Sequence, residues 1–192
     1  MVFFSNKNRR GSESVQDDYS LWQNLKNGSA DSLKSLHYRY YNELYQYGLR
    51  ITNNPAMAKE AIQDLFVYIW EKHSTLNTVK SIKPYIFKSF RNRLIKKRAS
   101  KILYIDNLDN LEKTFFDFSI EDFIIGNEND KELKERVKNL LNKLSKNQKE
   151  VILLKFYHNL TYREIAELLN IEYQSVRNSV SRAFKILRKH IE

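Results

Sequence analysis

The sequence predicts an all-α fold: two small helical domains joined by an acidic linker, the C-terminal one a helix-turn-helix. Three observations support this prediction. The 192 residues include only four glycines and two prolines, too few for the many turns of an all-β fold. Apolar side chains recur at steps of three and four residues, as on the buried face of a helix. Basic and acidic residues also fall in separate blocks along the chain.

The formal net charge of +10 is distributed unevenly. Residues 1–71 carry eight basic and eight acidic side chains, whereas residues 72–105 carry ten basic side chains and no acidic one. Residues 106–135 reverse this balance with ten acidic against three basic, and residues 136–192 carry twelve basic against five acidic. A uniform compositional bias would not produce these blocks. We therefore expect two basic modules, suited to a polyanionic partner, on either side of an acidic connector.

The N-terminal domain is expected at residues 19–100, after a flexible polar segment at residues 1–18. An Asn-Gly-Ser turn at residues 27–29 ends a short first helix that starts near Tyr19, and Pro55 is well placed to open a later helix. The longer helices are expected at residues 31–51, 55–73 and 84–100, with a loop of no clear period at 73–83.

The connector between the domains is predicted to be an acidic linker at residues 101–131, where helical periodicity is lost. Its Phe and Ile side chains between residues 115 and 125 are too apolar for a fully solvated coil, so we expect this stretch to dock on the domains or on a partner. Helical periodicity returns at Glu132, which places the C-terminal domain at residues 132–192.

The C-terminal domain carries the local signals of a helix-turn-helix. Capping boxes begin helices at Ser145 and at Thr161. Asn170 can adopt the left-handed conformation that the following turn requires, and Ile171 is expected to fill the angle between the helices. A last helix then places one apolar stripe on a single face: Val176, Val180, Phe184 and Leu187. A plain helical hairpin is the alternative.

The opposite face of this last helix suits a DNA duplex. Recognition helices present their N-terminal residues to base edges in the major groove, so Arg177 and Asn178 are candidates for guanine and adenine contacts. Arg182, Lys185 and Arg188 could meet phosphates. All the outward side chains are neutral or cationic and can donate hydrogen bonds, among them Gln174, Ser175 and Ser181.

A second basic helix is predicted at residues 83–98. Phe87, Phe90 and Leu94 lie on one side of it. Basic side chains interleaved with aromatic ones suit single-stranded nucleic acid, whose bases can stack or be held flipped out. A solvated helix face over an aromatic core stripe would give the same pattern. The absence of any acidic residue from 72 to 105 favours DNA.

Patterns for catalysis or metal binding are missing from the sequence. There is no Cys for a disulfide or a thiolate zinc site, and the four His are scattered. No Gly-rich phosphate loop is present. We therefore expect no enzyme, no cofactor, no metal and no small-molecule substrate. Because neither a signal-peptide core nor a membrane-spanning apolar run is found, we also expect a cytoplasmic protein.

Residues 58–70 resemble a signature of the extracytoplasmic-function sigma factors, in the order acidic–x–x–Gln–acidic–x–Phe–x–x–x–Trp. Five residues match it: Glu60, Gln63, Asp64, Phe66 and Trp70. The resemblance implies that they bind core RNA polymerase at the β′ clamp helices. The spacing is compatible with this role, because residues three and four apart share one exposed helix face. Without the resemblance, an ordinary solvated face would explain the same pattern.

The basic helix looks like the family's −10 recognition helix, and the loop before it would help to hold a flipped base. The resemblance implies −10 DNA contacts by Lys83, Tyr85, Lys88, Arg91, Asn92, Lys96, Lys97 and Arg98. Residues 144–188 resemble the family's second domain, which reads the −35 element. The implied contacts are Thr161, Tyr173, Gln174, Ser175, Arg177, Asn178, Ser181, Arg182 and Lys185. Asn170 stands where Gly is usual, and Glu172-Tyr173 replaces a Ser-containing helix start.

The resemblance thus implies a sigma factor that binds core RNA polymerase, reads −35 DNA, and melts and reads −10 DNA. The implied partners are the β′ clamp helices and the β flap of the polymerase, double- and single-stranded promoter DNA, and an anti-sigma factor. Two other functions remain open on the residues alone: a dimeric helix-turn-helix regulator that binds palindromic DNA, and a basic RNA- or ribosome-binding protein.

Overall fold

The computed structural model describes residues 17–103, 137 and 139–189 of the chain. Every element within these residues is helical, and none is a strand. The predicted all-α fold is therefore confirmed. No helix in this part of the chain is both long and apolar enough to cross a membrane.

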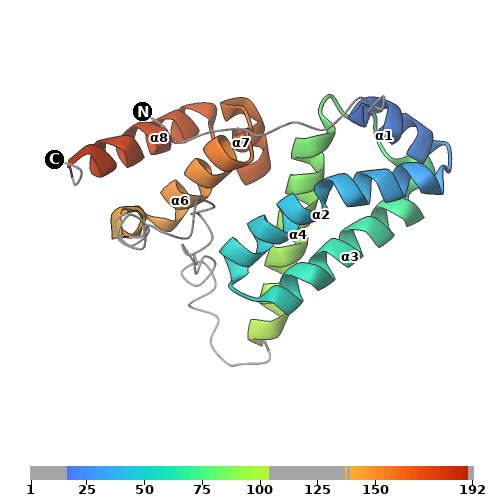
Figure 1. Cartoon of the computed structure of the whole chain (residues 1–192), viewed down its shortest axis with the longest axis horizontal. Coiled ribbons are helices and arrows are strands. Elements are labelled where there is room, and N and C mark those ends of the chain that lie inside the picture. The colour runs from blue at the N-terminus through green and yellow to red at the C-terminus, as the bar shows by residue number, and fades with distance from the viewer. Residues whose placement is uncertain (1–16, 104–136, 138, 190–192) are drawn as a thin grey trace, which may run out of the picture.

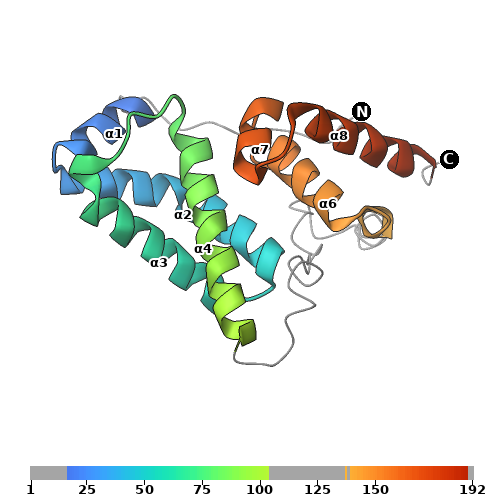
Figure 2. The same cartoon turned by 180° about the vertical axis from the view of Figure 1, so that it is seen from behind.

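Four α-helices build the N-terminal part: α1 (Asp18–Lys26), α2 (Ala30–Thr52), α3 (Pro55–Glu71) and α4 (Ile82–Leu103), with a short 3-10 turn, η1 (His73–Thr75), after α3. Helices α2 and α3 lie side by side, and α4 crosses them (Figures 1 and 2). The C-terminal part, α6 to α8, forms a second group of helices beside the end of α2 (Figure 1).

Local side-chain caps determine where the first three helices begin. The side chains of Asp17, Ser29 and Asn54 each accept a hydrogen bond from a backbone N–H in the first turn of α1, α2 and α3. Pro55 occupies the first turn of α3, where its missing N–H costs nothing, as predicted. Asn53 ends α2 in the left-handed conformation, with φ 48°.

Helix α4 is longer than predicted. It begins at Ile82, two residues before the expected start at Pro84, and continues to Leu103. Proline is tolerated in this first turn because the N–H groups there have no intrahelical acceptor. The last three residues of α4 had been expected to open the linker. The third helix is shorter than predicted and ends at Glu71, which leaves His73 in η1.

The core of the N-terminal part is aromatic and tightly packed. Trp22, Tyr47, Phe87 and Phe90 are all fully buried. Each such side chain stabilises the fold by about 2 kcal/mol through removal of apolar surface from water. Gly48 lets α2 approach its neighbours closely, because a Cβ atom there would lie 2.8 Å from Phe90 Cζ.

The helix-turn-helix consists of α6 (Lys146–Ile152), η4 (Leu153–Tyr157), α7 (Tyr162–Leu169) and α8 (Tyr173–Lys189). Both predicted capping boxes are present. Ser145 N–H donates to Gln148 Oε1 at 2.9 Å, and Thr161 N–H donates to Glu164 Oε2 at 2.8 Å. Asn170 has φ 54°, the left-handed turn that its position predicted.

Two details of the helix-turn-helix differ from the predictions. Ile171, which directly follows the left-handed Asn170, does not fill the angle between α7 and α8 but is 41% exposed. Leu168 of α7 and Val176 of α8 are both buried. Phe184 is 40% exposed and packs edge-on against Phe156, with ring centroids 5.5 Å apart.

The segment η4 is a π turn, which the sequence did not predict. His158 N–H donates to the carbonyl oxygen of Leu153, five residues earlier, at 3.1 Å. A π turn accommodates one residue more than an α turn and is common at functional positions. The predicted acidic linker beyond residue 103, and the predicted polar segment before residue 17, lie outside the described residues.

Candidate nucleic-acid interface

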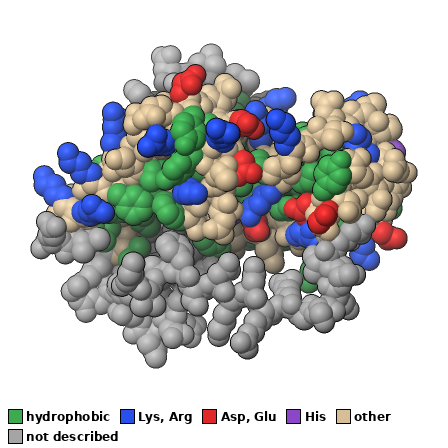
Figure 3. All heavy atoms as spheres, turned by 90° about the horizontal axis from the view of Figure 1, so that it is seen from above, with side chains coloured by type: hydrophobic (Ala, Val, Ile, Leu, Met, Phe, Trp, Pro, Cys, Tyr) green, Lys and Arg blue, Asp and Glu red, His purple; other side chains and the backbone are tan. Residues whose placement is uncertain are grey.

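Helix α8 presents the predicted DNA-reading side chains to solvent. All the residues of α8 named for −35 contact are exposed, whereas Val176, Val180 and Ala183 on the opposite side are buried. Gln174 Nε2 donates to Asn178 Oδ1 at 3.1 Å, which orients the two amides toward the same side. Figure 3 shows Lys and Arg side chains gathered over the end of the molecule that α8 forms.

The predicted contact Thr161 is exposed, but its hydroxyl already serves the cap of α7. It accepts from Glu164 N–H at 3.3 Å and donates to Glu164 Oε2 at 2.9 Å. Tyr173, at the start of α8, is 43% exposed and faces the ring of Tyr162 at 6.4 Å. The helix-turn-helix thus has a side-chain cap at the start of α7 and an exposed polar face on α8.

Helix α4 presents its predicted contacts differently. Lys88, Asn92 and Lys96 are exposed. Three other basic side chains of α4 are held by carboxylates from other helices. Lys83 Nζ lies 2.6 Å from Glu43 Oε2, Lys97 Nζ lies 2.8 Å from Asp64 Oδ2, and Arg91 Nε lies 2.8 Å from Glu150 Oε1.

Aromatic contacts hold another part of α4. The half-buried ring of Tyr85 meets Trp22 edge-on at 5.2 Å, and burial raises the pKa of its hydroxyl. Arg93 lies over the ring of Tyr68, with its guanidinium carbon 4.4 Å from the ring centroid. Arg98 is half-buried. The structure therefore gathers the predicted −10 residues on one helix but leaves only part of them accessible.

The residues of the α3 signature divide between two surfaces. Glu60, Gln63 and Asp64 are exposed, and both carboxylates face Lys97 of α4, at 3.4 Å from Glu60 and 2.8 Å from Asp64. Lys97 therefore joins two patches that were predicted to have different partners. These two carboxylates also raise the pKa of Lys97.

Gln63 instead lines an apolar groove between α2 and α3, together with Phe66 and Trp70. Phe66 is 6% exposed, so it contributes an edge rather than a full face, whereas Trp70 is 37% exposed. The groove is completed by aromatic and aliphatic side chains of both helices: Leu33, His37, Tyr41, Ile62 and Val67. Burial lowers the pKa of His37.

A buried ionic contact that the sequence did not predict joins the two parts of the molecule. Glu150 of α6 is 2% exposed. Its carboxylate accepts from Arg91 Nε at 2.8 Å, from Arg91 Nη2 at 3.4 Å and from the Tyr47 hydroxyl at 2.7 Å. A bidentate guanidinium–carboxylate pair of this kind is strong and directional. Burial alone would lower the pKa of Arg91, but the nearby Glu150 carboxylate raises it overall.

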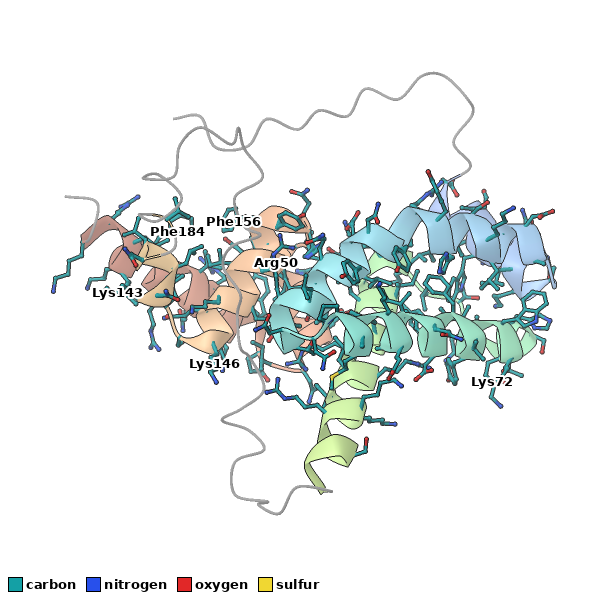
Figure 4. The ribbon with its side chains drawn as sticks, turned by 60° about the horizontal axis from the view of Figure 1, so that its bottom comes forward. Arg50, Lys72, Lys143, Lys146, Phe156 and Phe184 are labelled. Atoms are coloured by element: carbon teal, nitrogen blue, oxygen red, sulfur yellow. The ribbon has the colours of Figure 1, made fainter. Side chains whose placement is uncertain are left out.

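His158 forms a second buried cluster beside this contact. Its ring packs against Phe87 at 4.8 Å and Tyr47 at 5.6 Å, and its Nδ1 lies 3.5 Å from Glu43 Oε2. Burial lowers the pKa of His158, so its neutral form is favoured. Arg50, fully buried, lies over the ring of Tyr157 at 4.4 Å. Figure 4 shows Arg50 where the end of α2 meets the C-terminal helices.

One further hydrogen bond closes the edge of this contact: the Ser81 hydroxyl donates to Glu164 Oε1 at 3.1 Å. A sequence signal for the contact did exist. Glu150 directly precedes the apolar run 151–154, and Arg50 lies within the apolar stripe of α2. A charge in a buried stripe requires a partner. Among the described residues, no group of three or more His, Asp or Glu is placed to hold a metal ion.

Two family models match the chain. Sigma-70 region 2 matches residues 36–101, and Sigma-70 region 4 matches residues 134–187. The chain is 26% identical over 165 residues to the RNA polymerase sigma factor YlaC of Bacillus subtilis (strain 168), covering 84% of this chain and 92% of that protein. It is 21% identical over 157 residues to the ECF RNA polymerase sigma factor SigM of the same organism, covering 82% and 93%.

Two solved structures share the fold. CnrH, in complex with the cytosolic domain of CnrY, matches with a TM-score of 0.60 and 18% identity over 91% of this chain and 96% of that one. The sigma factor RpoE of Bartonella quintana, in complex with the anti-sigma factor NepR, matches with a TM-score of 0.62 and 20% identity over 84% and 98%. With regions 2 and 4 in order along one helical chain, this protein belongs to the sigma-70 family as an extracytoplasmic-function sigma factor, acting in promoter-specific initiation of transcription.

Proposed function

We propose that this sigma factor reads a promoter with two helices and docks on core RNA polymerase with a third. In this proposal α8 reads the −35 element as a duplex, α4 reads the −10 element as an opened strand, and α3 binds the polymerase. The single observation that carries it is the position of the exposed polar face of α8, opposite the buried Val176, Val180 and Ala183 and directly after a capped turn.

The −35 assignment follows from the order of side chains along α8. Gln174, Arg177 and Asn178 lie in its first two turns, the part of a recognition helix that meets base edges. Arg can donate two hydrogen bonds to guanine, and Asn can pair with adenine. Arg182 and Lys185 lie further along and suit phosphates. We propose Thr161 as a backbone contact at the cap of α7.

The −10 assignment uses the exposed side of α4. Lys88, Asn92 and Lys96 are accessible to a strand in the present arrangement. Lys83, Arg91, Lys97 and Arg98 would join them by exchanging their protein partners for phosphates, and Tyr85 would offer a ring edge. Cationic side chains along one helix face can follow the backbone of a single strand.

For core RNA polymerase we propose the groove between α2 and α3 as the principal contact of the β′ clamp helices. Aromatic side chains at the centre of an interface supply most of its binding energy, and Trp70 is the exposed aromatic of this groove. Gln63 would add hydrogen bonds at the rim, and Glu60 and Asp64 would add negative charge beside it. The β flap would then meet the C-terminal domain.

An anti-sigma factor is a further proposed partner. CnrH is named in complex with the cytosolic domain of CnrY, and RpoE in complex with the anti-sigma factor NepR. We propose domains at residues 19–100 and 132–192, an acidic linker between them, no catalytic activity and a cytoplasmic location. These proposals follow from the charge blocks and motifs of the sequence.

The test is reconstitution with core RNA polymerase on a pool of genomic promoter fragments. We expect the chain to bind core and to start transcription from a subset of fragments that share two short elements. Gln63→Ala combined with Trp70→Ala should lower core affinity by about tenfold, as for interface hot spots. The matched control is Tyr38→Ala, an aromatic that is 78% exposed on α2 but does not line the groove.

Two results would overturn the proposal. If the chain does not bind core and starts transcription nowhere, the sigma role fails. If the chain alone binds palindromic duplexes as a dimer, and does so without polymerase, a conventional helix-turn-helix regulator becomes the better description.

A further inference from the structure

We infer that the chain can hold its two domains together in a closed arrangement. In this arrangement the Glu150 carboxylate of the −35-reading domain binds Arg91 of the −10-reading helix, and a promoter phosphate competes with Glu150 for that guanidinium. The closed arrangement is read from the contacts themselves. The competition rests on the proposed function, because it requires that α4 meets DNA.

The contact between the domains has the character of a fitted interface. Glu150 and Tyr47 are 2% and 0% exposed, although their sequence positions are 103 residues apart. The fully buried His158 ring and the Arg50–Tyr157 stacking extend the same surface. The Glu150 carboxylate is buried together with the guanidinium and the hydroxyl that donate to it, as in a specific contact, because burial of an unpaired charge is costly.

Arg91 has the geometry of an anion-binding site in which the Glu150 carboxylate is the bound anion. Nε and Nη2 both face Glu150, and the Arg91 side chain is only 17% exposed. Carboxylate and phosphate oxygens bind a guanidinium in the same two-pronged way. A phosphate can therefore reach these two donors only after Glu150 has left them.

The same contact is suited to switching rather than to permanent stability. A buried ion pair gains little over separated, hydrated charges because both ions lose water, yet removal of one partner alone is strongly unfavourable. DNA or polymerase can thus open the chain by replacing one partner with another of equal charge.

The first experiment measures closure directly in the full chain. Because the sequence has no Cys, Lys72→Cys and Lys143→Cys give two unique spin-label sites, and Figure 4 shows these exposed positions at opposite ends of the molecule. We expect one narrow distance distribution in the parent chain. Glu150→Gln should add longer and broader distances. Glu167→Gln, which removes an exposed carboxylate of α7, should leave the distribution unchanged.

A second variant controls for misfolding. Arg91→Lys keeps the charge on α4 but cannot make the two-pronged contact, so we expect partial opening with unchanged helix content by circular dichroism. An unchanged distance distribution in both Glu150→Gln and Arg91→Lys would overturn the closed arrangement.

The second experiment measures competition with a fluorescein-labelled random single-stranded DNA. Glu150→Gln should bind it at least about fivefold more tightly than the parent chain, the lower end of ordinary coupling between sites. Glu167→Gln sets the effect of net charge alone. An equal gain in both variants would overturn the competition for Arg91.

A failure of the proposed function gives a different result from a failure of the closed arrangement. Lys88→Ala, introduced together with Glu150→Gln, should weaken strand binding if α4 reads DNA. If it does not, the −10 assignment fails, whereas the distance distributions still decide whether the chain closes.

Discussion

The two basic helices α4 and α8 carry similar charge and present it in opposite ways. On α8, none of Arg177, Arg182 and Lys185 forms an ion pair with a carboxylate among the described residues. On α4, Lys83, Arg91 and Lys97 each lie within 3 Å of a carboxylate oxygen. Charge along the sequence therefore indicates which helices can meet a polyanion, but only the fold indicates which are available to do so.

The difference has a physical origin in what packs against each helix. Within the part of the chain that the structure describes, α8 is the last helix and packs its buried side on α6 and α7, with Phe184 against η4. Helix α4 is contacted by α1, α2, α3 and α7. Carboxylates reach its cations from α2, from α3 and, at Arg91, from α6. A cation beside so many neighbours meets a carboxylate more readily than it meets solvent.

The largest expected effect comes from loss of the Arg91–Glu150 contact, which joins α4 to the C-terminal domain. Arg91→Ala leaves Glu150 buried without its cation, which should disfavour the closed arrangement by about 3–5 kcal/mol. The spin-label distances described above should then be mostly long. Arg93→Ala is the matched control, because Arg93 lies over Tyr68 and not against the C-terminal domain. Equal opening in both variants would contradict the special position of Arg91.

The next effect tests the open presentation of α8. Arg177→Ala should weaken binding of a −35 duplex by about 1–3 kcal/mol, as for loss of one base contact, and should not change the interdomain distance. Arg163→Ala, an exposed arginine of α7, controls for lost charge. Fluorescence anisotropy at constant salt measures the affinity. A larger loss for Arg163→Ala would show that α7, not α8, faces the duplex.

An intermediate effect concerns pH. Because the pKa of His158 is lowered in the closed form, the open form binds a proton more readily there, and the closed form should lose stability as pH falls below about 6.5. Above that pH the His158 contribution is constant. The charged groups that face the ring are Glu43, Lys83 and Arg50, of which Glu43 favours and the cations oppose protonation.

The measurement is the spin-label distance distribution in rapidly frozen samples between about pH 7.5 and 5.5. His158→Phe keeps an aromatic ring against Tyr47 and Phe87 and should abolish the pH response. The pKa of Glu43 is lowered, since its contacts with His158 and Lys83 outweigh burial, so Glu43 stays charged through this range. A pH response that survives His158→Phe would assign the effect to another group.

The smallest effect separates two lysines of α4. Lys88→Ala should reduce the slope of log affinity against log salt by about 0.7 for single-stranded DNA, the value for one phosphate. Lys97→Ala should reduce it less, because Lys97 is already paired with Asp64 and Glu60 of α3. Equal slopes in the parent chain would contradict the held state of Lys97.

Features that depend on a few adjacent residues were predictable from the sequence. The capping boxes at Ser145 and Thr161, the left-handed Asn170 and the proline start of α3 all appear as predicted. Each depends on residues within about one helical turn, where the side chains allow few backbone conformations. The exposed face of α8 belongs to the same class, since it is the complement of an apolar stripe.

The sequence can mark a charge as buried, but it could not predict which distant residue pairs with it. Arg91 and Glu150 are 59 residues apart, and no local pattern couples them. The sequence marked Arg91 as a DNA contact and gave Glu150 no role. Ile171 is a different case: it was expected to be buried because it is apolar, but it is 41% exposed although the left-handed turn directly before it was predicted correctly.

The π turn η4 also determines how this part of the chain tolerates insertions and deletions. Glu150 and His158 are eight residues apart, whereas two turns of an α-helix take about 7.2 residues. The one extra residue of a π turn absorbs this difference, so both side chains face the N-terminal domain. Deletion of one residue within Leu153–Tyr157 would rotate everything after it by about 100° relative to Glu150. The recognition helix would survive such a deletion intact but point elsewhere, so homologues that lack this residue should differ in how their two domains meet.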